Sequence, residues 1–147
     1  GGVVFGPASG SAVSSQTLDS YEEGTFTAGF SGCSFSAIGN TTGIYTKVGS
    51  LVTWNYYSES ANLINASGLA KFTGLPFTVR NTTSGFVPFS TTHNTFFGGS
   101  QNAGVTGYHG INTTECIFIN IGSTGGTSFV NGNGKAIMIG GTYFTDA

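Results

Sequence analysis

Charge is scarce in this sequence. Only 7% of its 147 residues are Asp, Glu, Lys or Arg, against roughly a quarter in ordinary soluble domains. The net charge is -2, and the basic residues, which are dispersed along the chain, are Lys47, Lys71, Arg80 and Lys135. Nucleic-acid binding needs clustered cations that displace counterions, so this composition argues against a nucleic-acid partner.

Long apolar runs and metal-binding motifs are also missing. No apolar stretch approaches the length of roughly 20 residues that spans a bilayer, so we expect no membrane insertion. Neither CxxC, HxH nor HxxxH occurs, so we predict no metal site and no cofactor. The two cysteines, Cys33 and Cys116, allow one disulfide bond or two free thiols. We favour free, partly buried thiols, because an unpaired cysteine packs as a small hydrophobic residue.

Helical patterns are nearly absent, and strand patterns take their place. Short runs rich in Val, Ile, Thr, Tyr and Phe alternate with Gly, Asn and Ser at intervals of about 8–12 residues. Glycine accounts for 25 residues and phenylalanine for 13. This pattern predicts an all-β fold, an antiparallel β-sandwich or jelly roll. We expect one domain over residues 18–147 and a lead-in segment over residues 1–17.

The clearest expected element is a β-hairpin. A Gly49-Ser50 turn joins Ile44–Val48 to Leu51–Tyr57, and Val52, Trp54 and Tyr56 share one face of the second arm. Further strands are expected within residues 68–79, 85–91, 103–111, 115–122, 127–132 and 135–146.

Lysine and proline are too scarce to protect free sheet edges in the usual way. We therefore expect the sheets either to close or to be covered by another copy, and we predict an oligomer. The single methionine is Met138, so we expect a fragment, a processed product or the ordered part of a longer protein.

Half of the six acidic residues crowd into the segment LDSYEEGTF, residues 18–26. Asp19, Glu22 and Glu23 could form a catalytic pair, a calcium site or a structural element. Catalytic carboxylates of glycosidases normally come from separated elements that face a cleft, and the spacing is not that of an EF-hand. We favour a structural turn whose carboxylates accept backbone N–H groups or pair with Arg80 or a lysine.

Residues 91–112 combine aromatic, histidine and amide side chains with several glycines. This mixture suits sugar binding, because aromatic faces stack on pyranose rings and amides bond hydroxyl groups. It equally suits an ordinary loop with Phe96 or Phe97 turned inward. We expect both histidines to lie in loops, solvated or hydrogen-bonded rather than metal-bound. The candidate receptor-binding residues are His93, Asn94, Phe97, Gln101, Asn102, Tyr108 and His109.

Motifs in a fixed order give the sequence a recognisable resemblance. LDSYEEGTF, followed by GIYTKVGSLVTWNYY and then GLPF, resembles the C-terminal domains of bacteriophage tail fibres, especially in phages of aquatic bacteria. The acidic segment of that family usually reads Leu-Asp-Asp-Tyr-Glu-Glu-Gly-Thr-Trp-Thr-Pro. Here Ser20, Phe26 and Ala28 stand in place of its second Asp, its Trp and its Pro.

The resemblance implies a homotrimeric, β-rich tip domain without enzymatic activity, located on the tail fibre of an extracellular virion. Its partners would be the fibre stalk or other virion proteins and a host-surface receptor, either a glycan or an outer-membrane receptor. Residues 1–17 would join the tip to the stalk, and Asp19, Tyr21, Glu22 and Glu23 would form a structural joint.

Other virion roles stay open. One is a head fibre or decoration protein with a purely structural role. Another is a glycan-degrading tailspike, which would need two carboxylates facing a groove. Away from the acidic block it could draw only on Glu59, Glu115 and Asp146.

Overall fold

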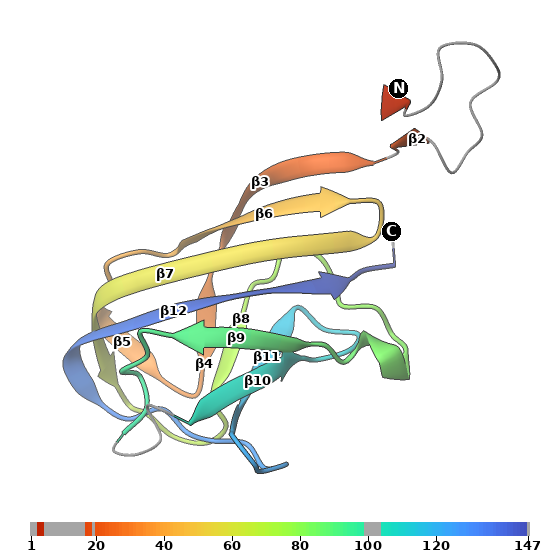
Figure 1. Ribbon diagram of the computed structural model, residues 1–147. Coiled ribbons are helices and arrows are strands. Elements are labelled where there is room, and N and C mark those ends of the chain that lie inside the picture. The colour runs from red at the N-terminus through yellow and green to blue at the C-terminus, as the bar shows by residue number, and fades with distance from the viewer. Residues whose placement is uncertain (1–2, 5–16, 19, 99–103, 147) are drawn as a thin grey trace.

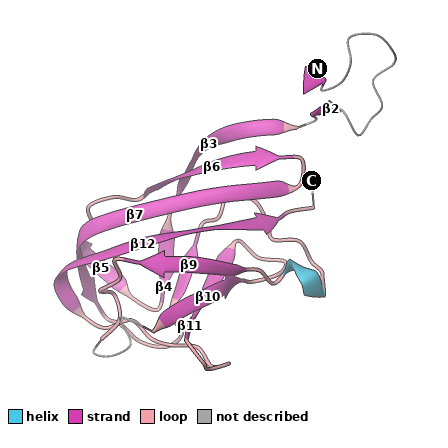
Figure 2. Ribbon diagram, viewed as in Figure 1, coloured by secondary structure: helices cyan, strands magenta, loops and turns pink. Residues whose placement is uncertain are grey.

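The computed structural model describes residues 3–4, 17–18, 20–98 and 104–146 (Figure 1). These residues form an all-β fold whose only helical element is one short 3-10 turn, η2 at Thr83–Gly85 (Figure 2). The predicted fold class is confirmed at this level. The homotrimer stays a prediction.

The strands fall into two antiparallel sheets. A small one pairs β1 (Val3–Val4) with β2 (Thr17–Leu18). The main sheet contains β3 (Tyr21–Thr27), β4 (Gly29–Ser31), β5 (Ser34–Ala37), β6 (Thr42–Val48), β7 (Leu51–Ile64), β8 (Lys71–Thr73), β9 (Pro88–Thr92), β10 (Val105–His109), β11 (Glu115–Asn120) and β12 (Gly132–Phe144).

The main sheet curls until it is nearly a barrel. Its order is β3-β6-β7-β12-β9-β10-β11-β8-β4, and β5 pairs with β7 beside this path. The strands at the two ends of the path, β3 and β4, are separated in the chain by Ala28 alone. The chain therefore passes from one end of the sheet to the other at Ala28, whose N–H donates to the Thr41 carbonyl at 2.8 Å.

The barrel interior is filled with aromatic rings. Trp54 stacks on Phe72 with centroids 5.1 Å apart, and Phe26 meets both rings edge-on. A Cβ at Gly43 would collide with the edge of the Phe26 ring, so glycine is favoured where β6 crosses this residue. The aromatic pairs among Trp54, Phe72 and Phe26 stabilise the fold beyond the area they bury, because stacked and edge-to-face rings attract one another electrostatically.

The predicted hairpin is confirmed. Val48 pairs with Leu51 across a turn in which Gly49 has φ +58°, a conformation that glycine adopts at little cost. Val52, Trp54 and Tyr56 are buried, whereas the residues between them are exposed. Cys33 and Cys116 are free thiols, as expected.

The strand expected over residues 127–132 is wrong. Residues 127–131 form a loop, and β12 begins only at Gly132. The side chain of Phe129 holds this loop in place, because it is buried against Phe96, Phe97 and Phe118. An apolar residue at the centre of the segment thus anchors a loop in the core.

Sheet closure leaves short free edges among the described strands. β4 and β5 are brief, and β3 is the longer strand with a single partner. β3 carries Glu22 and Glu23, both exposed, and charges on an edge strand discourage pairing with another chain. Near-closure of the sheet, one of the two arrangements expected from the sequence, thus accounts for most of its edges, and the oligomer stays a prediction.

Candidate functional site

The predicted receptor-binding residues do not gather on one surface. Gln101 and Asn102 lie outside the described residues. Asn94, Phe97 and His109 are buried, with 8%, 0% and 0% of their surfaces exposed. As folded, these three side chains cannot contact a receptor. His93 is exposed and Tyr108 is partly exposed against Phe86.

Asn94 and Phe97 have structural roles. The Asn94 amide oxygen accepts the Phe96 N–H at 3.3 Å, and its nitrogen donates to the Thr91 hydroxyl at 3.2 Å. These bonds fix the turn after β9. Phe97 packs against Phe118 at a centroid distance of 5.2 Å. Of the two possibilities for Phe97, the inward one is confirmed.

His109 is a core residue, so the expectation that both histidines lie in loops is wrong. It ends strand β10, and its Nε2 accepts the indole N–H of Trp54 at 2.9 Å. Its Nδ1 lies 2.6 Å from the Val87 carbonyl oxygen, so Nδ1 carries the proton and the imidazole is neutral. Burial lowers the pKa of His109, and the hydrogen bond to Val87 opposes that shift.

This geometry predicts a loss of stability in acid. The unfolded chain takes up a proton on His109 near its ordinary pKa of 6.5, whereas the folded chain does so only at lower pH. The contribution of His109 is therefore complete above a pH of about 6.5 and declines as the pH falls below it. A proton on Nε2 of His109 would also point at the indole N–H of Trp54, so that the hydrogen bond between them would be lost.

No carboxylate is among the described groups that face His109, so none of them would stabilise a protonated imidazole. These groups are Trp54 on β7, Phe89 on β9, Cys116 on β11 and Tyr143 on β12. Urea unfolding at a pH of about 7.5 and of about 5.5 measures the effect. The variant His93→Ala should keep the pH dependence, and equal stability of the wild type at both pH values would contradict the prediction.

The acidic block forms strand β3 rather than the expected turn. Asp19 lies outside the described residues, and Glu22 and Glu23 are exposed. Neighbouring residues of a strand point to opposite faces, so these two carboxylates do not face a common site. The Tyr45 hydroxyl donates to Glu22 at 2.5 Å, and the Tyr21 hydroxyl donates to Glu23 at 2.8 Å.

Tyrosine hydroxyls therefore take the place of the expected backbone N–H, arginine or lysine partners. The hydrogen bond from each phenol to its carboxylate raises the pKa of Tyr21 and of Tyr45. The cations have other partners: Arg80 pairs with Asp146 at 3.1 Å, and Lys71 pairs with Glu115 at 2.8 Å.

Metal and membrane sites find no support in the part of the chain that the structure describes. No group of three or more His, Cys, Asp or Glu side chains there is arranged to hold a metal ion. No helix of the described residues is long and apolar enough to cross a membrane.

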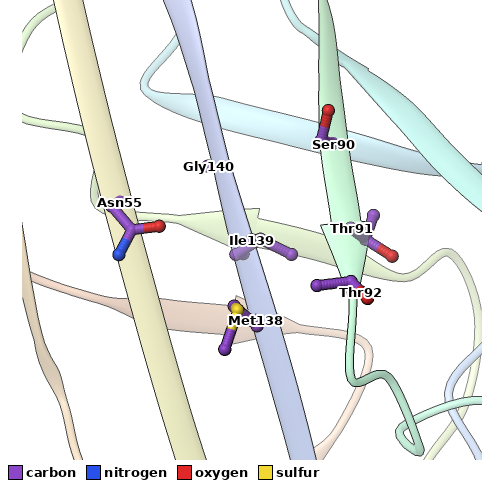
Figure 3. A pocket seen from close by; sticks show the side chains of 7 residues that line it. All are labelled: Asn55, Ser90, Thr91, Thr92, Met138, Ile139 and Gly140. Carbon is purple, nitrogen blue, oxygen red and sulfur yellow. The ribbon is translucent and has the colours of Figure 1, made fainter.

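A hollow on the outside of the sheet is the candidate binding site (Figure 3). Outward residues form a register row in which Ile44 pairs with Asn55, Asn55 with Gly140 and Gly140 with Ser90. Because Gly140 lacks a side chain, the row is interrupted there. The resulting hollow has a volume of about 220 Å³ and is lined by Asn55, Ser90, Thr91, Thr92, Met138, Ile139 and Gly140.

The lining of this hollow is uncharged. Asn55 from β7 and Ser90 from β9 stand on its two sides, and Met138 closes one end. Among the described residues, neither the Asn55 amide nor the Ser90 hydroxyl has a hydrogen-bond partner. The sequence pattern did place Asn55 on the outward face of β7, but the strand order that brings Ser90 near it is not readable from the sequence.

A second outward row is apolar. Tyr21 pairs with Val48, Val48 with Leu51 and Leu51 with Phe144, across β3, β6, β7 and β12. Their exposed fractions are 56%, 39%, 38% and 40%. We call these four residues the apolar row. Contiguous exposed apolar side chains often mark an interaction surface.

No family model, curated protein or solved structure matches the chain. The fold defines the class, an antiparallel all-β domain, and the case for a function is built on its surface.

Proposed function

We propose that the chain is the distal domain of a bacteriophage tail fibre, homotrimeric and without catalytic activity, which attaches the virion to a receptor on the host surface. The ordered motifs of the sequence support the family. One observation supports the attachment role: on the outer face of β7, β12 and β9, an uncharged hollow presents an amide and hydroxyl groups to solvent.

The arrangement of the two surfaces suits a fibre. The apolar row lies at the end of the sheet where the chain enters β3, beside the C-terminal end of β12 (Figure 1). If the stalk precedes β3, three copies would meet through the apolar row near the stalk. The hollow lies farther along β7 and β12, where it would stay accessible.

A purely structural role in the virion is the second candidate. It is favoured by the burial of Asn94, Phe97 and His109, which removes three side chains from the contact surface that the sequence suggested. A glycan-degrading role lacks comparable support, because the described carboxylates are engaged by separate tyrosines or cations.

Adsorption to host cells tests attachment. The purified domain, added in excess, should occupy receptors and slow adsorption of the intact particle, because both compete for the same sites. An unrelated acidic β-domain of similar size is the control. If the folded domain neither binds the cells nor slows adsorption, the attachment role is wrong and the structural role is favoured.

A further inference from the structure

We propose that the hollow around Gly140 binds one saccharide ring of the receptor. This inference rests on the proposed attachment function and places its contact surface on the outer face of the sheet, where only Thr91, Thr92 and His93 of residues 91–112 take part. The occupant follows from the shape, the polarity and the border of the hollow.

The shape depends on a glycine. A Cβ at position 140 would lie 3.0 Å from the Asn55 side-chain oxygen and 2.9 Å from the Trp54 carbonyl oxygen. Any side chain there would displace the Asn55 amide or β7 itself. Gly140 thus leaves a gap in the middle of β12, and Asn55 leans over it from the neighbouring strand (Figure 3). Glycine within a strand often marks such a close approach of a ligand or another backbone.

The polarity selects a neutral, hydroxylated ligand. Asn55 offers both a donor and an acceptor, and the exposed Ser90 and Thr92 hydroxyls can do the same. Charged side chains are absent from the lining, so a phosphate or carboxylate would find no counterion. Gly140 forms an apolar floor of the hollow, and Met138 forms an apolar wall at one end of it. A pyranose ring has this same division, with hydroxyl groups at its edge and C–H groups on its face.

The border adds an aromatic pair. Met138 pairs across the strands with Tyr57, and the His93 ring meets Tyr57 edge-on at 5.8 Å. His93 has φ +46°, a conformation that is uncommon for residues other than glycine and that concentrates at functional sites. Tyr57 and His93 therefore place a ring surface beside the Met138 end of the hollow, where the next sugar of a chain could stack.

Amide NMR of the ¹⁵N-labelled domain tests the site directly. The probes are the methyl glycosides of glucose, galactose, mannose and N-acetylglucosamine, with glycerol as the control for general polyol effects. At least one glycoside should shift the Asn55 side-chain amide and the Gly140 backbone amide, with a dissociation constant on the order of millimolar. Glycerol at the same concentration should not.

Matched variants locate the contact. Asn55→Ala removes an exposed amide without a protein partner and should weaken binding about three- to tenfold, the loss expected for one hydrogen bond. Thr25→Ala removes an exposed hydroxyl from the same outer face, two strands from Asn55, and should leave affinity unchanged. Both variants should melt like the wild type. Equal affinity of Asn55→Ala and the wild type would overturn the site.

The failure of the site and the failure of the attachment role give different results. If none of the glycosides shifts the Asn55 and Gly140 amides, or if the shifts gather at Phe86 and Tyr108, the hollow is not the saccharide site. The domain could still block adsorption in that case, and the attachment role would survive. If the domain binds no host cells, the attachment role itself falls.

Discussion

Replacing His109 with alanine is expected to lower the free energy of unfolding by about 3–5 kcal/mol. The imidazole is fully buried, and both of its nitrogens are used. Its removal leaves the Trp54 indole N–H without its partner in the core, whereas the Val87 carbonyl keeps the backbone N–H of residue 109 at 2.9 Å. It also opens a cavity between the rings of Phe89 and Tyr143. Buried polar groups without partners and unfilled space both destabilise a fold.

Urea unfolding measures this loss. His93→Ala is the matched control, because His93 is exposed and makes no hydrogen bond within the described residues, so that even with its positive φ the substitution should cost about 1 kcal/mol or less. A double-mutant cycle with Trp54→Phe, which removes the indole N–H, isolates the hydrogen bond itself. If His109→Ala unfolds at the same urea concentration as His93→Ala, the core role of His109 is wrong.

The fold class was predictable because the alternation in the chain is strong. Val52, Trp54 and Tyr56 define the inward face of β7, and the Gly49-Ser50 turn sets the register with β6. Local information suffices for this hairpin. The position of β12 beside both β7 and β9 depends on contacts between residues far apart in the chain, and the sequence pattern does not contain it.

Residues 91–112 show where composition misleads. Glycine, asparagine and histidine suggested exposed loops, but Val105, Gly107 and His109 alternate inward along β10. A Cβ at Gly107 would collide with the Ile117 carbonyl and the Phe89 ring, so this glycine serves packing rather than a flexible turn. A period-two search through residues 105–109 would have placed His109 on the same face as Val105.

The candidate site was missed for a different reason. Asn55 and Ser90 lie far apart in the sequence and become neighbours only through Gly140, which is registered against both of them. No sequence motif marks such a hollow. It exists because Gly140 has no side chain and because β12 lies between β7 and β9. The acidic block shows the opposite case: its local pattern was evident, and Tyr21 lies only two residues from its partner Glu23, but the contact of Glu22 with Tyr45 on β6 required the register.

Introducing charges at Val48 and Leu51 is expected to convert the proposed trimer into monomers. Both residues belong to the apolar row, and covering the 39% and 38% of their surfaces that are still exposed would contribute roughly 0.5–1 kcal/mol each, in every copy. The double variant Val48→Lys/Leu51→Glu replaces that gain with the cost of removing two charges from water. Because the two positions pair directly across the hairpin, opposite charges there should preserve the fold of the monomer.

Sedimentation at micromolar concentration measures the outcome, and thermal unfolding checks that the monomer is folded. The matched control is Leu69→Lys/Ile121→Glu, which places the same charges on exposed apolar residues, 43% and 66% accessible, outside the apolar row. The control should remain a trimer, because only the apolar row is proposed to be covered. A wild-type chain that sediments as a folded monomer would refute the trimer. A trimer that survives Val48→Lys/Leu51→Glu would place its contacts on another surface.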